Sequence, residues 1–119
     1  MDNKDNIEKE KQISKEYKKL KKMFKFLDKE KENLADKLCK KAAFMDVTLN
    51  DLQEKINEEG YIIEAVNGNG FKIRMDNPAA KGYNTMIKNF NQTIKHLIDL
   101  IPEESTESSD KLLEFVRKR

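Results

Sequence analysis

The sequence has little of what interrupts a helix or builds a catalytic centre. It contains four glycines, two prolines, one cysteine, one histidine and no tryptophan in 119 residues. The first glycine is Gly60 and the first proline is Pro78, which predicts that residues 6–58 are almost entirely helical. One cysteine excludes an internal disulfide. No apolar run approaches the roughly 20 residues of a membrane span. The first residues have no apolar signal core, so we expect a cytoplasmic protein without a membrane partner.

The residue types that carry chemistry are too few for a recognisable site. A zinc site needs about four ligands, and a nucleophilic triad needs a positioned base. Here Cys39 lies in an apolar stripe and His96 lies in a distant apolar segment. The run Asn67-Gly68-Asn69-Gly70 matches neither a phosphate-binding loop nor a dinucleotide fingerprint. The sequence therefore predicts a protein that is not an enzyme, with no catalytic residues, no metal and no cofactor.

Charge is abundant and unevenly distributed. Charged residues make up 39% of the chain, against about 25% in typical soluble domains. Residues 1–45 hold 14 Lys and 9 Asp or Glu, whereas residues 46–76 hold 3 Lys or Arg and 7 Asp or Glu. With only 37% hydrophobic residues, such a chain is expected to complete its core by self-association. The basic segment suggests polyanion binding or association with an acidic surface.

The hydrophobic pattern predicts a mainly α fold that opens with a helical hairpin. A continuous helical stripe with spacings of 4, 3, 4 and 3 comprises Ile13, Tyr17, Leu20, Phe24 and Leu27. Asp28, followed by Glu30 and Glu32, is a suitable helix N-cap, so we expect a break between two helices of roughly 20 residues. The alternative is one bent helix about 60 Å long. Thr48 resembles the first residue of a capping box and predicts a third helix that ends at Gly60.

The second half predicts one small β-hairpin and one long helix. YIIEAV and FKIRM flank the Asn-Gly-Asn-Gly run, which predicts a hairpin at 61–75. Asn77 and Pro78 then predict the start of a helix over 78–101. Its wide apolar face predicts an oligomer interface formed by Tyr83, Ile87, Phe90, Ile94 and Leu97.

Both ends of the chain are predicted to bind other molecules. Residues 1–28 are expected to form a basic helix, residues 29–102 a helical core, and residues 103–119 a flexible acidic linker with an amphipathic tail. The tail residues predicted to bind a partner are Leu112, Leu113, Phe115, Val116 and Arg117. The lysines predicted to share a helix face and contact DNA phosphates are Lys18, Lys21, Lys22, Lys25 and Lys29. A solvated lysine face is the alternative, and both stay open from sequence alone.

Residues 29–102 resemble a known family. The segment NLADKLCKKAAFMDVTLNDLQEKINEEG, then YIIEAVNGNG, then Asn77-Pro78-Ala79 leading into KGYNTMIKNFNQTIKHLIDLIP, resembles the small terminase subunit of tailed bacteriophages, of the cohesive-end type found in phages and prophages of Firmicutes. The order and spacing of these pieces carry the resemblance. Residues 1–28 share only a basic, helical character.

The resemblance implies a non-catalytic packaging protein. Such subunits form ring-like homo-oligomers, bind double-stranded viral DNA, and recruit and regulate a large terminase subunit that holds the ATPase and nuclease. Many carry a helix-turn-helix with a glycine in its turn, and no glycine precedes Gly60 here. The competing hypothesis is a structural or regulatory coiled-coil interaction protein without DNA binding, favoured by the stripe at 13–27.

Overall fold

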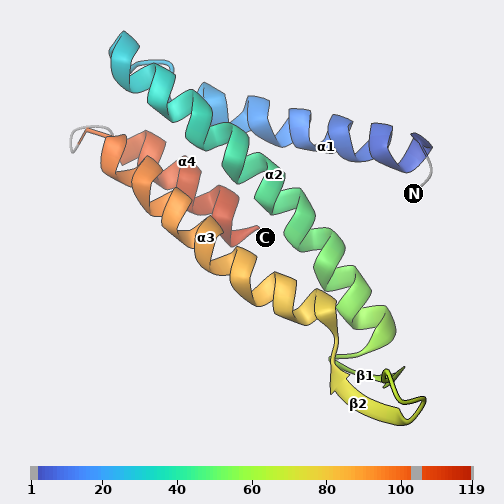
Figure 1. Ribbon diagram of the computed structural model, residues 1–119. Coiled ribbons are helices and arrows are strands. Elements are labelled where there is room, and N and C mark those ends of the chain that lie inside the picture. The colour runs from blue at the N-terminus through green and yellow to red at the C-terminus, as the bar shows by residue number, and fades with distance from the viewer. Residues whose placement is uncertain (1–2, 103–105, 119) are drawn as a thin grey trace.

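The structure is a computed structural model that describes residues 3–102 and 106–118, and it is mainly helical, as the sequence predicted. Four helices and one two-stranded antiparallel sheet make up the described chain. In chain order these are α1 (Asn3–Lys22), α2 (Lys29–Glu59), β1 (Ile62–Val66), β2 (Lys72–Asp76), α3 (Pro78–Leu100) and α4 (Thr106–Arg117), as Figure 1 shows.

The chain breaks between α1 and α2, where the sequence predicted a helical hairpin. After Lys22 the backbone tightens, and Met23 and Phe24 donate N–H bonds to carbonyls three residues earlier, at 3.0 and 3.1 Å. Asp28 then caps α2, because its carboxylate accepts a hydrogen bond from the Lys31 N–H at 2.9 Å. The two-helix hypothesis is confirmed, and the single bent helix is wrong.

Helix α2 runs without interruption from Lys29 to Glu59, so the predicted helix start at Thr48 is wrong. Ala43, Val47 and Leu49 are buried on both sides of that position and carry the helical packing through it. The Thr48 hydroxyl is buried and has no hydrogen-bond partner among the described residues, so it caps nothing. The predicted end at Gly60 is confirmed: its φ is +93°, and its N–H donates to the Ile56 carbonyl at 2.7 Å.

The β-hairpin forms where the sequence predicted it. The Gly70 N–H donates to the Asn67 carbonyl at 3.0 Å, and Gly70 alone in the loop has a positive φ, of +82°. This is the geometry of a three-residue hairpin loop, in which a tight turn is followed by a left-handed glycine. The Asn67 side chain strengthens the loop by accepting N–H bonds from Asn69 and Phe71, both at 3.0 Å.

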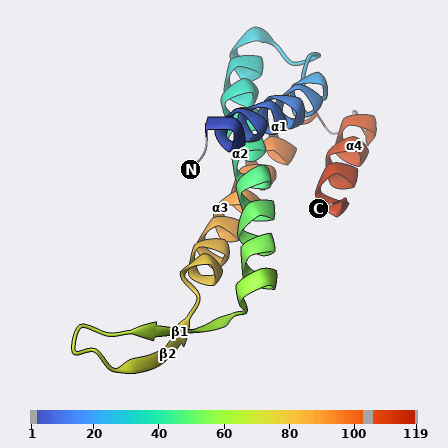
Figure 2. The ribbon, with the colours of Figure 1, turned by 90° about the vertical axis from the view of Figure 1, so that its right-hand side faces the viewer.

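Helix α3 folds back along α2, with the hairpin inserted between them (Figures 1 and 2). Its predicted start is confirmed: Asn77 accepts a hydrogen bond from the Ala79 N–H at 3.0 Å, and Pro78 is the first helical residue. The helix ends at Leu100, just before Pro102. None of the described helices combines the length and apolar character that a membrane crossing requires.

One apolar core cluster joins all four helices. Its buried members are Leu20, Phe24, Leu27, Ala35, Cys39, Ala42, Ala43, Met45, Leu49, Phe90, Ile94, Leu97, Ile101 and Leu112. They come from the second half of α1 and the turn after it, the first two thirds of α2, the second half of α3 and the middle of α4. The hairpin lies at the opposite end of the α2–α3 pair (Figure 1).

The predicted oligomer interface on α3 is largely wrong. Phe90 and Leu97 are fully buried and Ile94 is 6% exposed, all within the core cluster of their own subunit. Tyr83 and Ile87 are half-buried against the same cluster. The wide apolar face of α3 is therefore used mainly within its own subunit, where it packs into the shared core cluster.

The predicted linker and tail are also corrected. Residues 106–117 form α4, so the part of the predicted linker from 106 to 110 is helical, and residues 103–105 lie outside the described residues. Leu112 is fully buried in the core cluster, and Phe115 and Val116 pack against it. Of the five tail residues predicted to bind a partner, Leu113, which is 47% exposed, and Arg117 face solvent. The tail is therefore part of the subunit's own fold.

Two adjacent leucines of α4 test this packing. Replacing Leu112 with Ala should lower the free energy of unfolding by about 2–5 kcal/mol, because it removes a fully buried side chain. Replacing the exposed Leu113 with Ala should cost less than about 1 kcal/mol. Urea unfolding followed by circular dichroism measures both. Equal, small effects would mean that α4 does not contribute to the core.

Candidate nucleic-acid interface

Helix α1 presents most of the basic segment. More than half of its sequence is Lys and Glu, which have high helix propensity, and it contains no glycine or proline. Asp5 lies in its first turn, and Lys19, Lys21 and Lys22 lie in its last turn, each placed favourably for the helix dipole. Ile13, Tyr17 and Leu20 pack toward the core, which orients the remaining faces of the helix.

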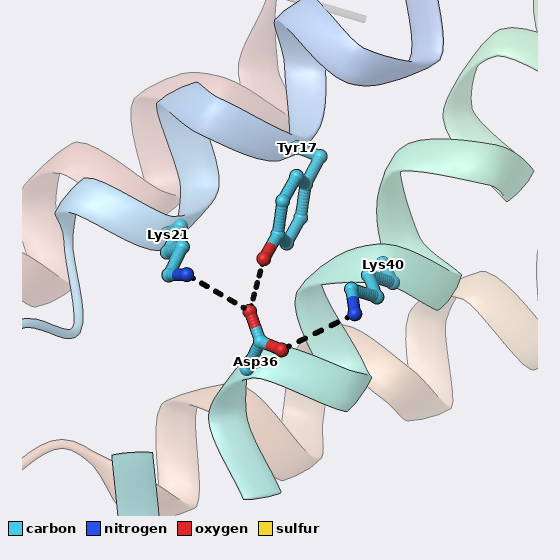
Figure 3. A network of polar contacts seen from close by, with 4 residues as sticks. All are labelled: Tyr17, Lys21, Asp36 and Lys40. Carbon is cyan, nitrogen blue, oxygen red and sulfur yellow. Dashed lines mark hydrogen bonds and ion pairs between the residues drawn. The ribbon is translucent and has the colours of Figure 1, made fainter. Parts of the chain in front are cut away.

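A polar network fixes α1 against α2 (Figure 3). The Tyr17 hydroxyl donates a hydrogen bond to Oδ1 of Asp36, which belongs to α2. The Lys21 Nζ lies 3.5 Å from the same oxygen, and the Lys40 Nζ lies 3.4 Å from Oδ2. Both ammonium groups also lie over the Tyr17 ring, 5.7 and 5.8 Å from its centre. One carboxylate and one aromatic ring thus hold lysines from both helices.

The network shifts the ionisation of its members. The hydrogen bond from Tyr17 is the largest effect and lowers the pKa of Asp36. Burial opposes it, and the charges of Lys40 and Lys21 each contribute a smaller lowering, so the pKa stays below its ordinary value. The Tyr17 oxygen, together with the Asp36 carboxylate, raises the pKa of Lys21. Lys21 is therefore held as a cation for the contact between helices.

The five lysines predicted to contact DNA do not share one helix face. Lys18 and Lys22 are exposed on α1, but Lys25 lies in the turn after α1 and Lys29 is the first residue of α2. Lys21 faces Asp36. The predicted shared face is wrong because α1 ends at Lys22 and α2 begins at Lys29, so helical spacing does not continue through residues 23–27.

The structure shows a different alignment, which we call the lysine stripe: Lys11, Lys15, Lys18 and Lys22. Spacings of 4, 3 and 4 place these residues on one face of α1, opposite the face that packs on the core. All four are exposed, and none forms an ion pair with another residue in the described part of the chain. The stripe is about 16 Å long, over which duplex DNA presents about ten phosphates.

The helical spacing of the stripe lysines is visible in the sequence, but the prediction was based on the segment in which lysines are most frequent. Lys11 and Lys15 lie outside the segment YKKLKKMFKFLDK, on which the prediction was based. Within that segment, Lys19 pairs with Glu16 at 3.5 Å and Lys21 with Asp36, so two of its lysines have partners in the chain. Fixing the core-facing residues first would have identified the opposite face correctly.

The two residues with reactive side chains lie apart from this surface. Cys39 is fully buried, and burial raises the pKa of its thiol to about 12, so it is a poor nucleophile at neutral pH. His96 is exposed on α3, beside a shallow hollow shared with Leu38 and Met86. No group of three or more His, Cys, Asp or Glu residues in the described chain is placed to hold a metal ion.

Comparison of the chain with known protein families, curated proteins and solved structures finds no match.

The Asp36 network predicts a pH-dependent contribution to stability. Because the folded-state pKa of Asp36 is lowered, its contribution is present above about pH 4 and is lost as the pH falls through the folded value. Asp36→Asn should therefore be less stable than the wild type by about 1 kcal/mol at pH 7, and the difference should shrink toward pH 3. Urea unfolding at both pH values measures it, with the exposed Asp99→Asn as control. A difference independent of pH would contradict this assignment.

Cys39 gives a second test. Dithionitrobenzoate at pH 8 should modify the folded protein very slowly, and the protein unfolded in guanidinium completely, because only the unfolded chain exposes the thiol. Since the folded-state pKa of about 12 exceeds the unfolded value of about 8.5, stability should be unaffected below pH 8.5 and decline as the pH rises above it. Fast labelling of the folded protein would show that the core opens around α2.

Proposed function

We propose that this chain is a non-catalytic phage DNA-packaging protein of the small terminase kind. In this proposal it binds viral double-stranded DNA as a ring-like homo-oligomer and recruits and regulates the large terminase subunit. The observation that carries the DNA-binding part is the lysine stripe on α1, an exposed cationic face without ion-pair partners among the described residues, which the Asp36 network orients. The resemblance of residues 29–102 supplies the biological setting.

The chemistry of the stripe favours the sugar–phosphate backbone over the bases. Its charged groups are all lysine ammoniums, which act as point charges toward phosphate. The stripe contains no Arg, Asn or Gln, the residues that most often form paired hydrogen bonds with base edges. We therefore expect DNA binding that depends strongly on salt and weakly on sequence, in which several copies on one duplex add their contacts.

Docking of the large subunit is assigned differently from the sequence prediction. Since Leu112 is buried, the surface of α4 that remains for a partner carries Leu113 and Arg117. Beside it, the end of α1 and α4 enclose an open groove of about 360 Å³, with Met23 and Phe115 among its lining residues and Lys22 at its rim. This groove and the outer side of α4 form a continuous surface on which a second protein can bind.

The coiled-coil alternative loses its main support in this structure. The stripe that favoured it, from Ile13 to Leu27, packs inside the subunit, with Leu20 and Phe24 in the core cluster. That stripe is therefore not available to a second helix from another chain. A protein that associates but leaves DNA mobility unchanged at low salt would revive this alternative.

Replacing the four stripe lysines with Gln tests the DNA interface. The slope of log affinity against log salt should become less steep by about 3.6, since each lost phosphate contact contributes about 0.9. The matched control replaces Lys37, Lys55, Lys81 and Lys88, which are exposed on α2 and α3, and so removes the same charge elsewhere. Fluorescence anisotropy with a labelled duplex measures both variants. Equal slopes in the two would exclude the stripe as the DNA contact.

A further inference from the structure

The β-hairpin projects from the end of the α2–α3 pair, away from the helical body (Figure 2). Every residue of β2 is exposed, and β1 alternates between exposed and half-buried residues. Phe71 is 68% exposed and Val66 is 67% exposed, high values for large apolar side chains. A lone two-stranded hairpin is marginally stable in water, so this one is expected to have a partner.

The two faces of the hairpin differ in chemistry. One face, which we call the apolar hairpin face, consists of Ile63, Ala65, Phe71, Ile73 and Met75. On the other face Glu64 lies opposite Arg74, Val66 opposite Lys72, and Ile62 opposite Asp76. The apolar hairpin face has no charged member, although Ile73 and Met75 are 38% and 39% exposed. Exposed apolar area of this kind marks an interaction surface.

The base of the hairpin is firmly attached. Asn77 is buried, and its side-chain amide donates to the Gly60 carbonyl at 2.9 Å and to Glu59 at 3.2 Å. Its backbone N–H donates to the Tyr61 carbonyl at 2.7 Å. The same residue thus ties together the end of α2, both strands and the start of α3. The hairpin is held away from the body in a defined orientation.

The ladder determines which backbone groups face outward. The Asn77 N–H bonds to Tyr61, and the Asn67 N–H bonds to the Phe71 carbonyl at 2.9 Å, at the two ends of the hairpin. Hydrogen-bonded pairs alternate with non-bonded pairs in an antiparallel ladder. The outward backbone groups therefore belong to Ile62, Glu64 and Val66 on β1, and to Lys72, Arg74 and Asp76 on β2.

The charges at the two edges select how a second copy can pair. Two β1 edges in antiparallel register would place Glu64 opposite Glu64, and two β2 edges would place Arg74 opposite Arg74. Like charges directly opposite each other destabilise a sheet. A β1 edge against a β2 edge instead places Glu64 opposite the partner subunit's Arg74. The hairpin is therefore complementary to a second copy of itself, one edge against the other.

We propose that the β1 edge of one subunit pairs antiparallel with the β2 edge of a second subunit of this chain. The inference rests on the self-association in the proposed function and assigns its surface. Because the two edges differ, the contact is heterologous and can repeat around a ring until no edge remains free. It aligns the apolar hairpin faces of successive subunits into one continuous band, which closure of the ring shields from water.

Proline at an outward-facing position tests the edge. Glu64→Pro removes one outward N–H but leaves the bonds within the hairpin, since proline is tolerated on an edge strand whose N–H faces solvent. Glu64→Thr is the control, because it removes the same charge and keeps the N–H. Sedimentation velocity should show self-association about tenfold weaker in the proline variant than in the threonine variant. Equal association of the two would overturn the proposal.

Mixing two charge-reversed variants gives an independent test if proline disturbs the hairpin. Glu64→Arg alone places Arg opposite Arg74 between copies, and Arg74→Glu alone places Glu opposite Glu64. Each variant should associate more weakly than the wild type, whereas an equimolar mixture should regain association by alternating the two. The pairing within each hairpin is equally disturbed before and after mixing, so recovery reports the contact between subunits. A mixture as dissociated as its components would contradict the pairing.

The outcomes separate this inference from the proposed function. A wild-type protein that light scattering shows to be monomeric at tens of micromolar would remove both self-association and the hairpin contact. A wild-type oligomer unaffected by Glu64→Pro would remove only the hairpin contact. The salt slope of DNA binding depends on the lysine stripe, so the DNA assay is read separately in either case.

Discussion

The arrangement of this molecule depends on the packing of four amphipathic helices around Phe24 and Phe90. Both aromatic rings are essentially buried, and Leu20, Leu97 and Leu112 bring α1, α3 and α4 to the same cluster. A chain with 37% hydrophobic residues has enough apolar side chains for one such cluster. The consequence is an elongated subunit whose core lies toward one end. At the other end only α2 and α3 pack together, and there they carry the hairpin (Figure 1). The exposed position of the hairpin follows from that asymmetry.

The core also orients the charge. Once Ile13, Tyr17 and Leu20 pack inward, the lysines of α1 divide into two groups. Lys21 turns toward Asp36 and stabilises the contact with α2, whereas the lysine stripe faces outward. The acidic surplus of residues 46–76 lies on the second half of α2, because the two acidic and two basic residues of the hairpin balance. The start of α1 packs beside this segment, with the Lys9 Nζ 3.7 Å from Asp51, whereas the end of α1 lies away from it. A polyanion that approaches this subunit is therefore attracted to the lysine stripe and repelled from the second half of α2.

Sequence alone predicted the elements better than their contacts. Asp28, Gly60, Asn77 and the Asn-Gly loop determine local geometry within a few residues, so they gave the correct boundaries for the helical hairpin, the β-hairpin and α3. The errors arose at positions where packing within the subunit, and not the local sequence, determines the structure. Thr48 resembles a cap, yet the buried residues around it keep α2 continuous. An apolar face such as that of α3 looks the same whether it contacts its own chain or another copy, and only the three-dimensional arrangement shows that Phe90 and Leu97 are buried within the subunit.

The difference between apolar side chains buried within the subunit and those left exposed makes the hairpin the stronger candidate for contact between subunits. On α3 and α4, the large apolar side chains are mostly buried by the subunit itself, so a second copy could gain little additional burial there. On the hairpin, Phe71, Ile73 and Met75 are exposed to water, and the outward backbone groups of both strands have no hydrogen-bond partner among the described residues. A second copy covers both kinds of surface at once, whereas a helix laid on the apolar hairpin face would leave the edges unpaired. The hairpin lies at the opposite end of the α2–α3 pair from the core cluster that holds α1 (Figure 1), so subunits can associate through it without covering the lysine stripe.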